Sequence, residues 1–301
     1  MAALLSPVAP GRSAGAAPAH SAKGGRLARH WPFLLIVPAL LVLLAVFVYP
    51  VAQTFLSAFT TPTPGVENFS WFFGSPANVA VLTRTFSAAL WSTVICLALA
   101  YPYAYLMTVA SPRARAALLL IVMLPFWTSL MVRTFAWLVL LQDTGVVNGL
   151  LGLIGVGPVG LVRSQTGVLV GMVQILMPFM VLPLYSVMSG IDRRLLVAGE
   201  SLGARPVVAL LRIFVPLSLP GVATGATMVF ITSLGFYVTP ALLGSPGEAL
   251  ISQFMYTQVN GMLMWGRGGA MAVVLFAATL LLMGLLGLVV RAGRRTRAGT
   301  R

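Results

Sequence analysis

Six apolar stretches, each about 20 residues or longer, most narrowly limit what this chain can fold into. A run of about 20 apolar residues matches the ~30 Å hydrocarbon core of a bilayer when it is helical. Only 8% of the residues are charged and 59% are hydrophobic, whereas about a quarter of a soluble domain is charged. The sequence therefore predicts an all-α integral membrane protein with six transmembrane helices. Their expected limits are 31–51, 86–109, 117–141, 167–188, 217–238 and 270–290.

The chain divides into three expected parts. Residues 1–30, rich in Ala, Gly, Pro and Ser, predict a flexible basic tail, 31–290 the six-span domain, and 291–301 a basic cytoplasmic tail. The first apolar run is longer than the ~7–15 residues of a signal-peptide core. We therefore expect it to be a retained span.

The basic residues predict the orientation in the membrane. The chain has 19 Lys and Arg against five acids, and 15 of the 19 lie in the two tails and in segments 111–116 and 189–220. Because cytoplasmic loops carry an excess of Lys and Arg, both termini and segment 189–220 are predicted to be cytoplasmic. This topology also accounts for the net charge of +14, so we expect membrane lipid and no nucleic acid as a partner.

No pattern in the chain predicts catalysis or a bound cofactor. The only lysine, Lys23, follows Ala22, so there is no Gly-Lys phosphate-binding loop. Both histidines precede the first span, and the lone Cys96 lies in an apolar run, which excludes a cysteine metal cluster. We predict no catalytic residue, no metal and no cofactor, so energy for any work must come from a partner.

The acidic residues argue against a proton- or sodium-driven carrier, which is expected to keep a carboxylate at membrane depth. All five fall outside the predicted spans, although carriers of neutral solutes do not need such an acid. They are Glu67, Asp143, Asp192, Glu200 and Glu248. A self-contained carrier or a channel therefore stays as the alternative class.

Segment 189–220 interrupts the apolar pattern and contains start and stop signals for two short helices. Its sequence is SGIDRRLLVAGESLGARPVVALLRIFVPLSLP. Asp192 is a candidate N-cap for a helix over 193–202. Gly203 stands where a helix ends in a left-handed residue. Pro206 suits the first turn of a second helix, because its missing N–H would be unbonded there. These signals predict a cytoplasmic helix-turn-helix between spans four and five.

The same segment resembles the Glu-Ala-Ala loop of the membrane permeases of bacterial ATP-binding-cassette (ABC) importers. Val197 stands at the usual Glu and Gly199 at the second Ala, which removes a charge, while the glycine and the closing prolines are kept. The resemblance implies that the segment couples the permease to an ATPase. The residues assigned to this coupling loop are Asp192, Leu196, Ala198, Gly199, Gly203, Ala204, Pro216 and Pro220.

Two aromatic patches are similar to the spermidine/putrescine branch of that family. The first is PFWTS followed by RTFAW at 133–137, and the second is GFYVTPALLG at 235–244, with Phe236 at the branch's usual Asp. The residues that the resemblance assigns to a translocation pathway are Phe126, Trp127, Arg133, Phe236, Tyr237 and Pro240. For Arg133, a snorkelling or capping role is the alternative to lining the pathway.

The resemblance implies a permease that forms half of a translocation pathway in the bacterial inner membrane, most consistent with a polyamine as solute. Its implied partners are two ATP-binding-cassette ATPase subunits, a second permease of different sequence, and a periplasmic or extracellular solute-binding protein. An importer for another small solute, such as an aminophosphonate or a small anion, remains the alternative within the family.

Overall fold

The computed structural model describes residues 36–298, and every regular element among them is helical. The predicted N-terminal tail, 1–30, and residues 299–301 of the predicted C-terminal tail lie outside the described residues. The chain divides into two units, Met1–Ala52 and Gln53–Arg301. The all-α prediction is confirmed for the described part of the chain.

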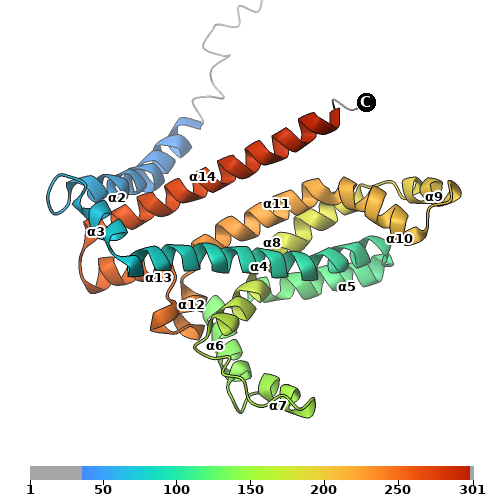
Figure 1. Cartoon of the computed structure of the whole chain (residues 1–301), viewed down its shortest axis with the longest axis horizontal. Helices are drawn as coiled ribbons and strands as arrows, with labels where there is room; N and C mark the ends of the chain where they lie inside the picture. Colours follow the sequence, from blue (N-terminus) through green and yellow to red (C-terminus); the bar gives the residue numbers. More distant parts are fainter. Residues whose placement is uncertain (1–35, 299–301) are drawn as a thin grey trace, which may run out of the picture. The chain divides into compact units, whose positions relative to one another are not determined.

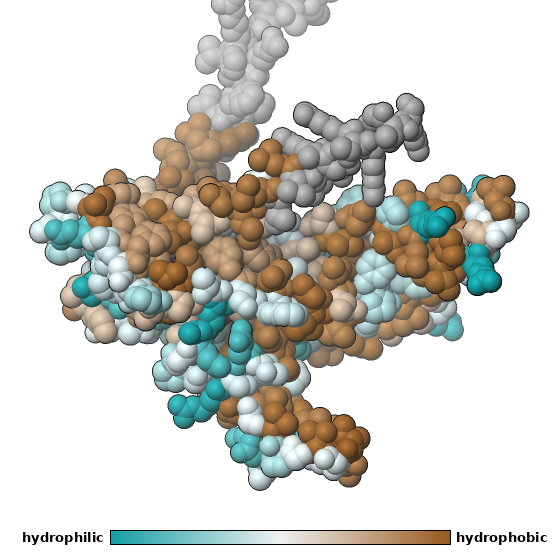
Figure 2. Space-filling model, viewed as in Figure 1, coloured by the Kyte–Doolittle hydropathy of each residue, from teal (hydrophilic) through white to brown (hydrophobic). Residues whose placement is uncertain are grey.

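Six helical stretches are long and apolar enough to cross a membrane, which confirms the six-span prediction. Many large apolar side chains on these helices are exposed, and Figure 2 shows them as brown surface along the long helices. Such a surface is stable when it faces lipid, where the backbone must satisfy its hydrogen bonds within the helix. The stretches are Ile36–Thr60, Pro76–Val109, Leu130–Leu153, Gln165–Ser189, Pro206–Leu234 and Trp265–Leu285.

The first described stretch contains a π-helical turn, η1 (Leu44–Val48), which leads into α2 (Tyr49–Thr60). The connection after it contains the helix α3 (Glu67–Gly74). The next span, α4 (Pro76–Val109), starts ten residues before the predicted limit of 86. Pro76 in its first turn explains this start, because proline there forgoes no helical hydrogen bond.

The segment predicted as the third span, 117–141, is not a single helix. It is divided among α5 (Pro112–Met123), the 3₁₀ turn η2 (Leu124–Trp127) and α6 (Leu130–Leu141), and the stretch long and apolar enough to cross a membrane, Leu130–Leu153, begins only at α6. Pro125 ends α5 because it lacks an N–H and its ring clashes with the carbonyl four residues earlier. A further short helix, α7 (Val146–Leu153), follows a turn at residues 142–145. The third hydrophobic stretch therefore bends at Pro125.

The main core lies where α8 (Gln165–Ser189) packs against α4 and α11 (Val215–Leu234), as Figure 1 shows. Close approach of α11 to α8 requires Gly221 and Gly225. A Cβ on Gly225 would lie 2.8 Å from the sulfur of Met180, and one on Gly221 would lie 3.2 Å from the Cα of Leu184. Small residues four positions apart bring two helices together in this way in membranes.

The last third of Gln53–Arg301 contains short helices and one long one. They are α12 (Val238–Leu243), η4 (Pro246–Glu248), α13 (Ile251–Tyr256), η5 (Thr257–Gly261) and α14 (Trp265–Ala298). Helix α14 continues past the predicted end of the span at 290, so residues 291–298 are helical. Along α4, α3 and α13 lie at one end and the connection between α8 and α11 lies at the other (Figure 1).

Candidate functional site

The docking stretch, residues 189–220, folds as consecutive short helices between α8 and α11. These are α9 (Arg194–Ser201), α10 (Pro206–Ala209) and the π-helical turn η3 (Leu210–Phe214), which runs directly into α11. Figure 1 shows α9 and α10 projecting together at the end of the α8–α11 pair. The stretch therefore forms a compact tip joined at both ends to core helices.

Hydrogen bonds to nearby residues cap both ends of α9. The Arg194 N–H donates to the Asp192 carboxylate at 2.9 Å, although α9 begins one residue later than predicted. At the other end Gly203 has φ 90°, the left-handed conformation that its position predicted. The Ala204 N–H donates to the Gly199 carbonyl at 3.1 Å and the Gly203 N–H to the Glu200 carbonyl at 2.9 Å. These two bonds are the Schellman pattern that ends helices at glycine.

Gly199 lets α9 lie directly on the segment that enters α11. A Cβ at this position would meet the Cδ1 of Ile213 at 2.8 Å and the Cβ of Ala209 at 3.7 Å. Leu196, on the same helix, packs against the main core. Gly199 in place of the family's second Ala leaves room for the Ile213 side chain, which would have to shift if a methyl group were present.

The outer face of the docking stretch is apolar with a basic surround. Leu202 is 89% exposed at the tip, and four further apolar side chains are also exposed, namely Leu195, Val197, Val207 and Leu211. The stretch also carries Arg193, Arg194, Arg205 and Arg212 against Asp192 and Glu200. Of the other residues assigned to the coupling loop, Ala198 is exposed and Ala204 is half-buried. Exposed apolar residues rimmed by charges are typical of a protein-binding surface.

Two arginines bind the carbonyls at the C-terminus of α4. The Arg115 guanidinium, from α5, donates to the carbonyls of Met107 at 3.1 Å and Ala110 at 3.5 Å. Arg193, from the docking stretch, donates to the carbonyl of Thr108. The last carbonyls of a helix have no partner within it, and arginine is a favourable donor there. The docking stretch is thus attached to α4 as well as to α8 and α11.

Pro216 and Pro220 lie in the first two turns of α11. Each proline removes one backbone donor, and the π-helical turn η3 immediately precedes them. Wide turns and prolines are the usual places where a long helix bends. The hydroxyl groups of Ser218 and Tyr101 lie 2.9 Å apart, which links this part of α11 to α4.

The two aromatic patches assigned to the pathway are brought together by the fold. Helices α6 and α12 are in contact, and the buried Thr134 and Thr239 hydroxyl oxygens are 3.4 Å apart. Pro240 is buried beside Thr239, Phe236 packs on the main core, and the Tyr237 ring lies 4.9 Å from that of Tyr256. These contacts make the second patch part of the packed structure.

The remaining pathway candidates lie at and just after the bend in the third span. The Phe126 ring is 5.7 Å from that of Phe179 on α8, and Trp127 is 79% exposed. The Nε of Arg133 is buried and has no hydrogen-bond partner. None of the six candidates lines the cavity described next, so their role in a pathway remains a prediction.

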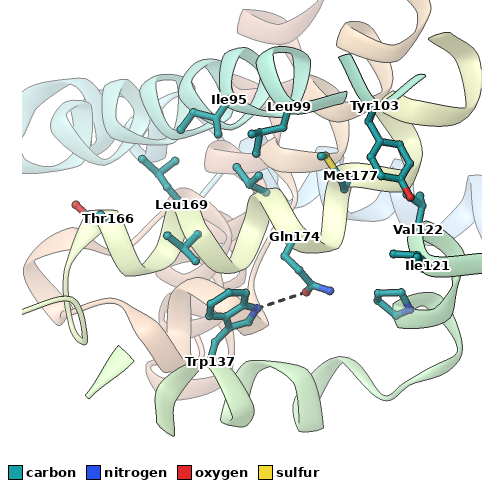
Figure 3. A pocket seen from close by; sticks show the side chains of 13 residues that line it. Ile95, Leu99, Tyr103, Ile121, Val122, Trp137, Thr166, Leu169, Gln174 and Met177 are labelled. Atoms are coloured by element: carbon teal, nitrogen blue, oxygen red, sulfur yellow. Dashed lines mark hydrogen bonds between the residues drawn. The ribbon is translucent and has the colours of Figure 1, made fainter. Parts of the chain in front are cut away.

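A cavity of about 520 Å³ lies between α4, α5, α6 and α8. Figure 3 shows apolar side chains around it, with the Gln174 amide extending from α8 toward Trp137 on α6. The Trp137 indole N–H donates to the Gln174 Oε1 at 3.5 Å, and the Tyr103 hydroxyl donates to the Leu118 carbonyl at 2.7 Å. The sequence interpretation missed Gln174, although an amide inside the apolar run 167–188 is a detectable signal.

No family model matches the chain. It is 31% identical over 253 residues to the spermidine/putrescine transport system permease protein PotB of Haemophilus influenzae, covering 83% of this chain and 87% of that protein. It is 32% identical over 216 residues to PotB of Escherichia coli strain K12, covering 71% and 77%. The fold is similar to that of a chain in the crystal structure of a bacterial alginate ABC transporter, with a TM-score of 0.70 at 18% identity, covering 85% of this chain and 92% of that one.

Proposed function

The chain belongs to the ABC-transporter permease family that includes the PotB proteins, and on this premise we propose that its solute is a polyamine. It is a multi-pass inner-membrane transport subunit and not an enzyme, and ATP is hydrolysed by a separate subunit. The similarity to PotB extends over most of both chains. Polyamine import is the activity that this similarity supports best.

The docking stretch is proposed to bind the ATPase. Its geometry is the observation that carries this assignment: two short helices, closed by a Schellman turn, project from the ends of α8 and α11 and expose Leu202 and Val197. The exposed valine replaces the charge that the family usually places there, so the contact would be mainly apolar. The basic side chains around it would pair with acids on the partner.

Movement would pass from the docking stretch into the membrane through three helices. The absence of a side chain at Gly199 lets α9 lie close to η3, and η3 continues into α11. Gly221 and Gly225 in turn let α11 lie close to α8. Arg193 adds α4 to this group. An ATPase that displaces α9 would therefore shift these helices as a unit, with Pro216 and Pro220 permitting α11 to bend.

The proposed assembly contains two ATPase subunits, a second permease of different sequence, and a periplasmic or extracellular binding protein. The chain's excess of Lys and Arg in the tails and the docking stretch supports cytoplasmic termini and a cytoplasmic docking stretch. The opposite end of α4, with α3 and α13, would then face the binding protein.

A small anion is the second candidate solute. The specific observation that favours it is Arg133, whose Nε is buried without a partner inside a membrane-spanning stretch. A cationic residue within a span is retained chiefly where it serves a substrate or ion pathway. The unpaired guanidinium would attract an anion and repel a polyamine.

Reconstitution of the full importer in proteoliposomes tests both parts of the proposal. We expect ATP-dependent uptake of radiolabelled spermidine or putrescine that requires the binding protein and all other subunits. Uptake of a small anion in place of polyamines would overturn the polyamine assignment. Co-purification of the ATPase with a Leu202→Asp variant, at the wild-type level, would overturn the assignment of the docking surface.

A further inference from the structure

Gln174 lies deep within a membrane-spanning helix. It is nine residues from the start of α8 and fifteen from its end, or about 14 Å and 22 Å at 1.5 Å per residue. An amide in this apolar setting is unfavourable unless its polar atoms are bonded. Among the described residues, its one hydrogen bond is the 3.5 Å contact from the Trp137 indole N–H, at the long limit of such bonds. The amide therefore keeps unused hydrogen-bonding capacity inside the cavity.

Of the other polar groups around the cavity, one already makes a hydrogen bond and one lies at the end of the cavity. The Tyr103 hydroxyl donates to the Leu118 carbonyl. Thr166 lies in the first turn of α8, at one end of the cavity in Figure 3. The remaining lining side chains, apart from the Trp137 ring, are aliphatic, and no lining residue carries a charge.

We propose that Gln174 and Trp137 form a binding station for an ammonium group of an aliphatic amine as it crosses the membrane. The carbonyl oxygen of Gln174 would accept a hydrogen bond from the ammonium, and the Trp137 ring would supply a cation–π contact. The aliphatic walls would contact the methylene segments of the solute. This inference rests on the proposed polyamine import and names residues that hold the solute along its path.

The chemistry of the cavity favours an aliphatic amine over a sugar or a multiply charged anion. A sugar would leave most hydroxyl groups without partners. Neither an anion nor an ammonium finds an opposite charge among the lining residues, but the ammonium has the Gln174 carbonyl oxygen as an acceptor. The volume of about 520 Å³ lies within the usual range for small-molecule sites. Because no carboxylate is present, the ammonium would be held weakly, as transport requires for release.

The test measures binding-protein-dependent uptake of radiolabelled putrescine and ATPase activity in the same proteoliposomes, for Gln174→Leu, Gln174→Lys and Gln174→Glu. We expect Gln174→Leu to lower uptake about tenfold and Gln174→Lys to lower it further, because a second cation repels the ammonium. Gln174→Glu should retain more uptake than Gln174→Leu. Stimulation of the ATPase by loaded binding protein should persist in all three.

Gln165→Leu, the same substitution in the first turn of α8 and outside the cavity, is the matched control and should transport normally. Unchanged uptake in Gln174→Leu and Gln174→Lys would contradict the proposed binding site. It would indicate that lipid acyl chains, and not the solute, fill the cavity. Equal losses in the leucine, lysine and glutamate variants would also overturn the proposed site, because they indicate packing rather than recognition of charge. Absence of putrescine uptake by the wild type, with uptake of another solute, would instead contradict the proposed function.

Discussion

The two sides of α8 are packed in opposite ways. Toward α11 the helices meet through Gly221 and Gly225, with contacts so close that a single methyl group would collide with Met180 or Leu184. Toward α5 and α6 the same helix borders a cavity of about 520 Å³. On the closely packed side, α11 is continuous with the docking stretch through η3. On the side of the cavity, the neighbouring segment bends at Pro125 between α5 and α6.

This difference suggests a division of labour between the two sides. A closely packed pair of helices transmits displacement because it has little free space to absorb it. A cavity beside a bent span can change its shape without breaking such contacts. We expect substitutions on the α11 side to impair coupling and stability, and substitutions on the cavity side to alter which solute passes.

The largest expected effect is at Gly203, in the turn between α9 and α10 within the docking stretch. Gly203→Val should reduce uptake at least twentyfold, because a β-branched residue is strongly disfavoured at φ 90°. No neighbour lies within 4 Å of a Cβ there, so the effect would come from the backbone alone. Gly203→Asn, which tolerates this conformation, should retain most uptake. Membrane insertion, checked by protease accessibility, should be normal in both, and normal uptake by Gly203→Val would contradict the coupling role.

Overpacking the α8–α11 contact should have the next largest effect. Gly225→Val should destabilise the protein by about 1–3 kcal/mol, since its side chain would collide with Met180. A fluorescence-detected melting curve in detergent should show a lower unfolding midpoint. Gly284→Val is the control, because a Cβ at that glycine of α14 meets nothing within 4 Å. A melting curve for Gly225→Val that overlays the wild type would refute the close packing.

Loss of the bond between the docking stretch and α4 should be milder. Arg193→Ala should lower the transport rate per ATP hydrolysed about threefold, because it removes the donor to the Thr108 carbonyl. Co-purification with the ATPase should be maintained. Arg194→Ala removes the neighbouring charge without this bond and should leave the ratio unchanged. If both variants lose transport equally, the charge of the stretch matters and the bond to α4 does not.

On the cavity side, added volume should be tolerated. Val170→Ile inserts one methylene beside empty space and should stabilise the protein by up to about 0.8 kcal/mol. The unfolding midpoint should rise slightly or stay constant, in contrast with Gly225→Val. A marked fall in the midpoint would show that the cavity is not available to the side chain and that the two sides of α8 do not differ.

Features set by local backbone chemistry were predictable from the sequence. The left-handed Gly203 and the helix start at Pro206 depend on one residue each, and both are present. Pro125 itself was visible in the sequence. A proline within a span can either end the helix or only kink it, so the sequence alone favoured one helix over 117–141. The early start of α4 at Pro76 lay outside the apolar run that hydropathy detects.

The cavity was not predictable because it is assembled from four helices. Gln174 and Trp137 are 37 positions apart, and their contact depends on how α6 turns after the bend. Close approach at Gly225 likewise depends on the register between α8 and α11, which the glycine alone does not specify. The pathway candidates came from a resemblance, which assigns residues to a role without placing them in space.

The attachment of Arg193 to α4 has a consequence for biosynthesis. The ribosome completes the Thr108 carbonyl 85 residues before it adds the arginine that binds it. Arg115, which donates to the neighbouring carbonyls of Met107 and Ala110, is made only a few residues after them. The Thr108 carbonyl therefore lacks its arginine partner until synthesis has reached the docking stretch.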